Sequence, residues 1–282
     1  AMHLNFSGID KIGHMWGGGD VDTLATYAWD PSTVMAQVHM PWIAKNADDQ
    51  IGRLITKLKK LGQWKETLFV VLADHGVTYG EKFYGQDYKN GSYDSWYNDP
   101  TGVCANTTYG RPPLTNPVLE PLNATGNIAY SYQSTAVEAW LIDQSWTKKM
   151  EAAAVMKTMP SVIATYVRWG DRYVLVSKGA MTTAEKTWWR ANGQRIINTM
   201  AFNGASDVVG LLQDHTNYSC YGDHGGAQKD VQRIPMVFYA KGIKHKNHSA
   251  QFRLVDVLPT VLRAMGVKRT APMDGKAYKL AF

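Results

Sequence analysis

The feature that most constrains the fold is an amphipathic segment that leads directly into an apolar one. Between Pro41 and Gly62, apolar residues recur every three or four positions, which predicts a helix with one buried face. Residues 68–73 follow at once, and their large apolar side chains predict a strand that is covered on both faces. This succession is typical of an α/β fold in which helices cover both sides of a large, mostly parallel sheet.

Elements of both kinds continue along the chain. Two β-rich runs flank a turn-like RWGD sequence, which predicts a hairpin at residues 162–176. A helix is expected after Thr182 or Thr183. Another buried strand, predicted at residues 234–240, precedes a helical pattern that ends at Gly266.

The composition predicts one large globular domain over residues 1–282, because 45% of the chain is hydrophobic and only 19% is charged. Residues 84 to about 135 differ from the rest, since they are rich in Tyr, Trp, Asn, Gly and Pro and show no sustained period. We interpret this stretch as a loop-rich insertion that forms a wall or lid over a site. A surface loop without function is the alternative.

Charge and hydropathy exclude two broad classes of function. The net charge is +6, but Lys and Arg are scattered in ones and twos, and no nucleic-acid-binding motif is present. No run of 18 apolar residues exists, so no membrane span is expected. Cys104 and Cys220 allow one disulfide, although two reduced thiols are equally compatible with the sequence.

Three Asp–His pairs stand in similar settings, each beside a glycine that allows a sharp turn. They are Asp10 with His14 in GIDKIGH, Asp74 with His75 in ADHG, and Asp223 with His224 in YGDHGG. The first two pairs follow predicted strands, one at residues 2–6, where apolar and polar residues alternate, and one at residues 68–73. Open α/β sheets carry their sites at the carboxyl ends of strands. Carboxylate and imidazole together suit zinc, manganese or iron, whereas calcium prefers oxygen ligands alone. A single histidine could equally cap a turn, but three such pairs favour a transition-metal site.

These motifs resemble the alkaline phosphatase superfamily, and most closely its type I phosphodiesterase/nucleotide pyrophosphatase branch. The likeness rests on D-x-x-x-H at residues 10–14, on ADHG at residues 73–76, and on GDHGGAQKDVQRIPMVFY from Gly222 onward. The order of the motifs also agrees with that family. The resemblance implies an α/β/α sandwich and phosphoryl transfer assisted by two metals.

The resemblance also implies a ligand set. Asp10, His14 and His224 would hold one metal, and Asp74 and His75 would hold the other. Zinc is the expected metal, with manganese or iron as alternatives. Asp223 and His215 would lie just behind the ligands, although each could instead serve only the local structure.

The catalytic nucleophile has no counterpart in this sequence. Family members carry a Thr or Ser nucleophile, and a further metal-binding Asp, upstream of the D-x-x-x-H motif, whereas only nine residues precede Asp10. We therefore expect this chain to be the C-terminal portion of a larger phosphodiesterase or phosphatase. The missing portion or an oligomer partner would cover the exposed sheet edge, and the resemblance suggests an extracellular or periplasmic protein.

Three alternatives to this function remain at this stage. The chain could be a catalytically inactive module that binds a phosphorylated ligand or another protein. It could also resemble a phosphoglycerate mutase or a sulfatase. The histidines in both D-x-x-x-H and ADHG argue against the sulfatases, whose calcium site consists of oxygen ligands.

Overall fold

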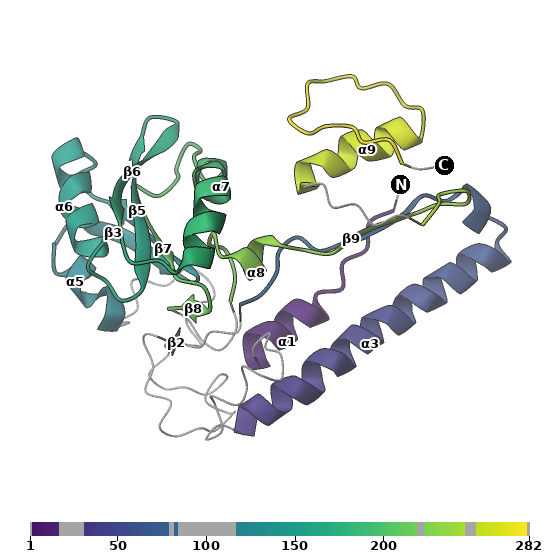
Figure 1. Ribbon diagram of the computed structural model, residues 1–282, viewed down its shortest axis with the longest axis horizontal. Coiled ribbons are helices and arrows are strands. Elements are labelled where there is room, and N and C mark those ends of the chain that lie inside the picture. The colour runs from purple at the N-terminus through teal and green to yellow at the C-terminus, as the bar shows by residue number, and fades with distance from the viewer. Residues whose placement is uncertain are drawn as a thin grey trace. The chain divides into compact units, whose positions relative to one another are not determined.

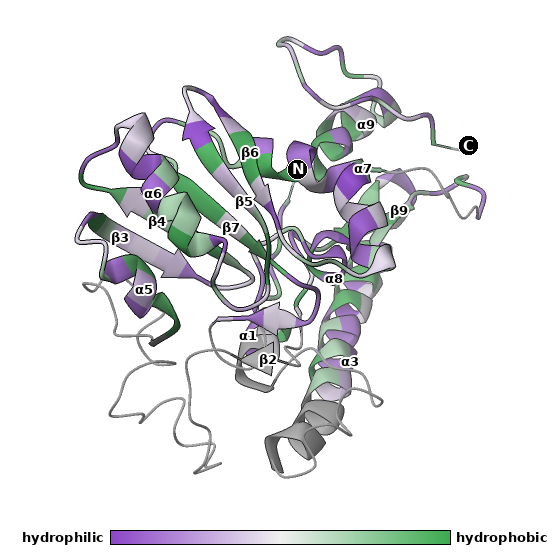
Figure 2. Cartoon of the chain, turned by 60° about the vertical axis from the view of Figure 1, so that its left-hand side comes forward, coloured by the Kyte–Doolittle hydropathy of each residue, from purple (hydrophilic) through white to green (hydrophobic). Residues whose placement is uncertain are grey.

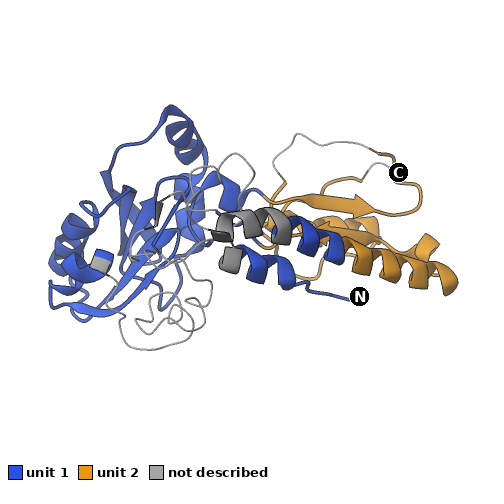
Figure 3. Ribbon diagram, turned by 90° about the horizontal axis from the view of Figure 1, so that it is seen from below, with its two compact units in different colours: residues 1–47, 75–233 blue, residues 48–74, 234–282 orange. Residues whose placement is uncertain are grey.

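The computed structural model describes residues 2–16, 31–78, 82–83, 117–218, 223–245 and 252–280. The chain divides into two compact units (Figure 3). Unit 1 comprises residues 1–47 and 75–233, and unit 2 comprises residues 48–74 and 234–282. The prediction of one large domain over residues 1–282 stays a prediction.

Unit 1 is built on an antiparallel sheet of five strands, the largest sheet among the described residues, in the order β3-β4-β7-β5-β6. The strands are β3 Ile128–Gln133, β4 Ala136–Leu141, β5 Val162–Trp169, β6 Arg172–Lys178 and β7 Val208–Leu212. β5 and β6 form the predicted hairpin, joined through a tight turn at Gly170. Figure 2 shows β5 and β7 coloured mostly as hydrophobic, as central strands that are covered on both faces require.

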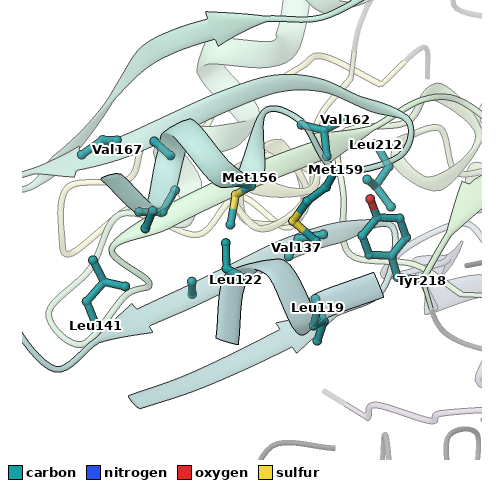
Figure 4. Close-up of a cluster of buried hydrophobic side chains, with 14 residues drawn as sticks. Leu119, Leu122, Val137, Leu141, Met156, Met159, Val162, Val167, Leu212 and Tyr218 are labelled. Carbon is teal, nitrogen blue, oxygen red and sulfur yellow. The ribbon is translucent and has the colours of Figure 1, made fainter. Parts of the chain in front are cut away.

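Helices cover both faces of this sheet. α6, Trp146–Met156, and the short α5, Glu120–Asn123, pack with alternate strand residues such as Val137 and Val167 on one face (Figure 4). α7, Thr183–Thr199, packs on the other face with Ile196 and Ile197. Its N-cap is Thr182, which forms a capping box with Glu185 and so confirms the predicted helix start.

The remaining parts of unit 1 are short. Its elements include α1 Gly8–Trp16, η4 Pro117–Leu119, β2 Lys82–Phe83, β8 Thr216–Asn217 and α8 Lys229–Gln232 (Figure 1). β2 and β8 pair in parallel, and an isolated antiparallel bridge joins Thr78 to Asp223. α3, Pro31–Lys60, begins in unit 1 and ends in unit 2. It includes Pro41, so the helix extends ten residues before the start that the sequence predicted.

Unit 2 contains a two-stranded antiparallel sheet among its described residues. β1, Phe69–Leu72, pairs with β9, Met236–Tyr239. The unit also contains η2 Trp64–Glu66, η5 Leu254–Asp256 and α9 Val257–Ala264. The Trp64 ring stacks on Tyr239 with centroids 4.9 Å apart, and Phe238 of β9 contacts Phe252, with ring centroids 5.4 Å apart.

The mixed α/β class is confirmed, but the sheet needs a correction. The largest described sheet is antiparallel, whereas a mostly parallel sheet was predicted. The physical reason is the length of the connections, because β3–β4 and β5–β6 are each joined by two residues, which is too short for a parallel crossover. The segment at residues 68–73 was also predicted to be buried, yet β1 is only half-buried, with Leu72 40% exposed.

The predicted loop-rich insertion at about 84–135 also changes its boundary. Residues 84–116 lie outside the described part of the chain, while regular structure begins at Pro117 and continues into β3. Cys104 and Cys220 likewise lie outside the described residues. Among the described residues, no helix combines the length and the apolar character that a membrane span requires.

Candidate metal centre

Three predicted ligands come together in unit 1. One ligand atom each from Asp10, His75 and His224 lies within 4.8 Å of the other two, and all three residues are half-buried. The Oδ1 atom of Asp10 is 3.5 Å from Nε2 of His224 and 3.9 Å from Nε2 of His75. Residues far apart in the sequence thus present one carboxylate and two imidazoles to the same point.

The first turn of α1 positions Asp10. The Nζ atom of Lys11 lies 3.3 Å from Oδ2 of Asp10, while Oδ1 faces the imidazoles. A side chain at Gly13 would lie 3.3 Å from the methyl groups of Val77, so the glycine lets α1 approach the segment that carries His75. Close helix packing therefore brings the carboxylate to the histidines.

The backbone around Gly76 positions His75. The Nδ1 atom of His75 lies 3.1 Å from the Gly76 carbonyl, which can only accept a hydrogen bond, so this contact places the proton on Nδ1. Nε2 then keeps its lone pair and faces Asp10. The Gly76 N–H donates to the Val231 carbonyl at 2.7 Å, and a side chain at Gly76 would lie 2.0 Å from the Asp230 carbonyl oxygen.

An isolated β-bridge positions His224. Thr78 and Asp223 exchange two backbone hydrogen bonds, of 2.8 and 3.2 Å, and Oδ1 of Asp223 accepts from the His224 N–H at 2.8 Å. The segment after β1 is therefore tied to the segment that carries His224. The two imidazole rings lie nearly parallel, at an interplanar angle of 18°, with centroids 3.5 Å apart.

The donor set fits a transition metal. Zinc accepts imidazole nitrogen and carboxylate oxygen, and a tetrahedral site with bonds of about 2.0–2.1 Å separates its ligand atoms by about 3.3 Å. The two Asp10 distances, 3.5 and 3.9 Å, are close to that separation. The hydrogen bond from His75 to the Gly76 carbonyl is the outer contact that orients many metal-binding histidines.

The other predicted site residues have different surroundings. His14 lies in α1, but its side chain is outside the described part of the structure. Asp74 is exposed and belongs to unit 2. Asp223 is 6% exposed and holds the turn before His224. Nδ1 of His215 lies 3.5 Å from Oδ2 of Asp230, whose backbone carbonyl contacts Gly76.

Sequence reasoning missed the strand β3 and its turn, which border this centre. Burial, together with the negative charges of Asp223 and Glu138, raises the pKa of the Tyr132 hydroxyl to about 12, so the phenol stays protonated at neutral pH. Thr135, in the turn after β3, accepts a hydrogen bond from Gly226. The alternating Tyr130 and Tyr132 were the available signal, but Ser, Asn and Gly around them suggested a loop.

The carboxyl groups near His215 form a second polar region in unit 1. Burial and the neighbouring carboxylates of Asp230 and Glu185 raise the pKa of the Asp214 carboxyl. The Asp214 N–H donates to Glu185 at 2.8 Å, so these groups link the start of α7 to α8. This network therefore contributes to the position of α8, which contacts Gly76.

Part of the chain matches the model of a known family. The family described as Sulfatase matches residues 43–125, a range that includes the ADHG motif but neither D-x-x-x-H nor GDHGG. Sulfatases share the alkaline phosphatase superfamily. The match confirms the resemblance to the alkaline phosphatase superfamily.

Among solved structures, the chain is similar to human ectonucleotide pyrophosphatase/phosphodiesterase 5. The sequences are 14% identical, the TM-score is 0.49, and the alignment covers 98% of this chain. This chain spans 63% of the length of that structure. No curated protein matches the chain.

Proposed function

We propose that the intact protein is a metal-dependent phosphoric ester hydrolase, of the phosphodiesterase/nucleotide pyrophosphatase or the phosphatase type. The observation that carries this proposal is the approach of Asp10, His75 and His224 within 4.8 Å. These residues come from all three motifs, and the superfamily match supports the class of reaction.

The ligand assignment keeps the two centres that the motifs predict. Asp10, His14 and His224 would hold one zinc ion, and Asp74 and His75 would hold the second. Oδ1 of Asp10 lies 3.5 Å from Nε2 of His224 and 3.9 Å from Nε2 of His75, so the two proposed centres would be neighbours at this carboxylate. Zinc in such a site polarises phosphoryl oxygens and lowers the pKa of a bound water to about 7.

Residues of this chain would orient the metal ligands. Lys11 would hold one oxygen of Asp10 while the other faces the histidines. The Nδ1–H group of His75 would donate to the Gly76 carbonyl and leave Nε2 available to bind a metal. We propose that the Thr or Ser nucleophile belongs to an upstream segment. Thr78 is fully buried and bonded through its backbone to Asp223, which makes it a poor candidate.

A sulfate ester hydrolase is the second candidate, favoured by the Sulfatase family match. The two histidines of the described centre oppose it, because an imidazole-rich site suits zinc rather than calcium. Assays of the longer protein with bis(p-nitrophenyl) phosphate, p-nitrophenyl phosphate and p-nitrophenyl sulfate distinguish the candidates. Turnover of the sulfate alone would contradict the main proposal, and turnover of none would favour the binding module.

We further propose that another polypeptide covers unit 2, as an N-terminal portion of a longer protein or as an oligomer partner. Large apolar side chains are exposed on its sheet and on α9, and natural proteins rarely leave such surfaces uncovered. They include Leu72, Val237, Tyr239, Leu254, Val255, Leu258 and Met265. Sedimentation of this chain as a stable monomer would contradict this proposal. An extracellular or periplasmic location belongs to the same proposal.

The test of the metal site is elemental analysis of the purified chain. We expect at least one zinc per chain, lost in Asp10→Ala and in His224→Ala. His245→Ala is the matched control, because His245 is exposed and lies in unit 2. Stoichiometric zinc that survives both substitutions, or a wild-type chain without any, would overturn the assignment of these ligands.

A further inference from the structure

Both backbone polar groups of Gly226 are bound by side chains. The Gly226 N–H donates to Oγ1 of Thr135 at 2.6 Å, and the Gly226 carbonyl accepts from Nε2 of Gln232 at 2.8 Å. Thr135 is fully buried in the turn between β3 and β4, and Gln232 ends α8. Two separate parts of unit 1 therefore hold the backbone of one residue, Gly226, on both sides.

The packing around this peptide leaves little room for another conformation. A side chain at Gly226 would lie 2.3 Å from the Thr135 carbonyl oxygen and 2.8 Å from its Oγ1. Gly225 adopts φ +109°, which favours glycine, and lies against Oγ of Ser134. The backbone that follows His224 is thus fixed by close contact as well as by hydrogen bonds.

The backbone that precedes His224 is fixed as well. Asp223 is bridged to Thr78, and its carboxylate accepts from the His224 N–H. His224 therefore lies between two anchors, the Thr78–Asp223 bridge on one side and the Gly226 peptide on the other. The first anchor was visible in the sequence as an Asp beside a His, but Thr135 is 89 residues away and carries no motif.

We propose that Thr135 and Gln232 are positioning residues for His224. They act through Gly226 and hold the imidazole in contact with His75 and Asp10. This inference rests on the proposed metal site and adds Thr135, which lies outside every quoted motif, and a role for Gln232, which lies within the third. Removal of a hydrogen-bond partner of a metal ligand typically lowers metal affinity by about 10–100-fold, and a displacement of His224 itself is expected to cost as much.

The test compares matched variants of the full chain. Thr135→Val keeps the shape of the side chain but removes the acceptor, and Thr135→Ser keeps the hydroxyl. Thr165→Val is the control, because Thr165 is equally buried in β5 of the same sheet. We expect zinc to bind Thr135→Val about 10–100-fold more weakly, by competition with a chromophoric chelator. Thr135→Ser and Thr165→Val should stay within about threefold of the wild type, by the same measure.

A second readout needs no metal. In the metal-free chain, the stacked rings of His75 and His224 shift each other's proton resonances, which can be followed in protein with isotopically labelled histidine. We expect Thr135→Val to move the His224 ring signals, and Thr135→Ser and Thr165→Val to leave them in place. If the wild type binds no zinc but these shifts occur, the metal site fails and the positioning role stands.

One combination of results would overturn the positioning role of Thr135. Wild-type ring signals together with wild-type zinc affinity in Thr135→Val would overturn the positioning role, even if that variant unfolds at a lower temperature. If Thr135→Val does not fold, Gln232→Leu decides, because Gln232 is exposed and its replacement disturbs no buried core. An unchanged His224 signal in Gln232→Leu would then overturn the proposal.

Discussion

The two units of this chain bury their apolar side chains to very different degrees. Among the described residues, both clusters of buried hydrophobic side chains lie in unit 1. Unit 2 instead relies on partly buried aromatic contacts such as Trp64 with Tyr239. Its α9 exposes Leu258 at 56%, and the adjoining Met265 is exposed at 62%. Unit 1 therefore has a buried hydrophobic core, whereas unit 2 leaves large apolar side chains exposed.

This difference indicates which unit is stable by itself and which unit can hold a functional site. A sheet covered on both faces can hold ligands rigidly, and the Asp10, His75 and His224 group belongs to the unit that has such a sheet. A two-stranded sheet is marginal by itself and needs further packing. Unit 1 is expected to fold on its own contacts, whereas unit 2 is expected to gain stability from a partner.

The largest effect is expected from the buried ion group of unit 1. Asp207 is fully buried, its Oδ1 contacts Lys149 at 3.1 Å and Arg168 at 3.0 Å, and its Oδ2 accepts from the Leu141 N–H. Asp207→Ala leaves two cations without their counter-ion, so we expect a loss of about 3–5 kcal/mol in urea unfolding. Lys148→Ala, in an exposed pair, is the control and should have no measurable effect. A loss no greater than that of the control would contradict the structural role of this group.

Truncation of one apolar side chain in each unit tests the difference in burial between unit 1 and unit 2. Leu122 is fully buried in the α5–α6 side of the unit 1 core, and Leu258 is exposed on α9. Leu122→Ala should lower the free energy of unfolding by about 2–5 kcal/mol, because it leaves a cavity. Leu258→Ala should change it by less than about 0.5 kcal/mol. An equal loss in both variants, measured by urea unfolding, would show that α9 is covered in solution.

One buried carboxyl in each unit should make the stability of that unit depend on pH, and the two dependences should have opposite signs. Burial raises the pKa of the Asp256 carboxyl, but hydrogen bonds from Lys276 and Arg253 outweigh burial and lower it overall. Its contribution is therefore present above the unfolded-state pKa of about 3.9 and lost as the pH falls further. In unit 1, burial raises the pKa of the Glu138 carboxyl. The buried, ionised Glu138 therefore lowers the stability of the folded state at neutral pH, and this loss disappears as the pH falls through the raised pKa and the carboxyl is protonated.

Hydrogen exchange of each unit between pH 7 and about pH 2, a range that extends below the unfolded-state pKa of an aspartate, measures these opposite signs. In the wild type, acid should lower the protection of backbone amides from exchange around η5 and raise it in β4. Asp256→Asn should remove the first effect, and Glu138→Gln should remove the second. Each variant is the control for the other, because the two carboxyls belong to different units. The same response of both units to acid in the wild type, unchanged in both variants, would contradict the assignment.

Local chemistry predicted much of the fold from the sequence. The hairpin of β5 and β6, the capping box at Thr182 and the strands β1 and β9 all follow from short-range patterns. The pairing of strands did not follow, because apolar runs that are buried on both faces look alike in parallel and antiparallel sheets. Only the connection lengths distinguish them, and β3 had been assigned to the loop-rich stretch.

The candidate site was predicted by residue type but not by grouping. Asp10, His75 and His224 were each recognised beside glycines, yet their approach depends on α1 packing against Val77 and on the bridge from Thr78. Such contacts link segments far apart in sequence, and no local pattern encodes them. The same reason explains why Thr135 was not recognised, since a buried threonine in a turn resembles any other.

The smallest expected effect concerns Gly52, in the part of α3 that belongs to unit 2. No atom lies within 4 Å of a side chain built there, so Gly52→Ala meets no obstacle among the described residues. Because glycine weakens a helix interior, we expect the substitution to stabilise the chain by about 0.5–1 kcal/mol in urea unfolding. Gly275→Ala is the contrasting variant, since its side chain would lie 1.8 Å from the Val255 carbonyl oxygen, and it should destabilise. Destabilisation by Gly52→Ala would instead mean that another polypeptide packs closely on α3, which would place the partner of unit 2 on that helix.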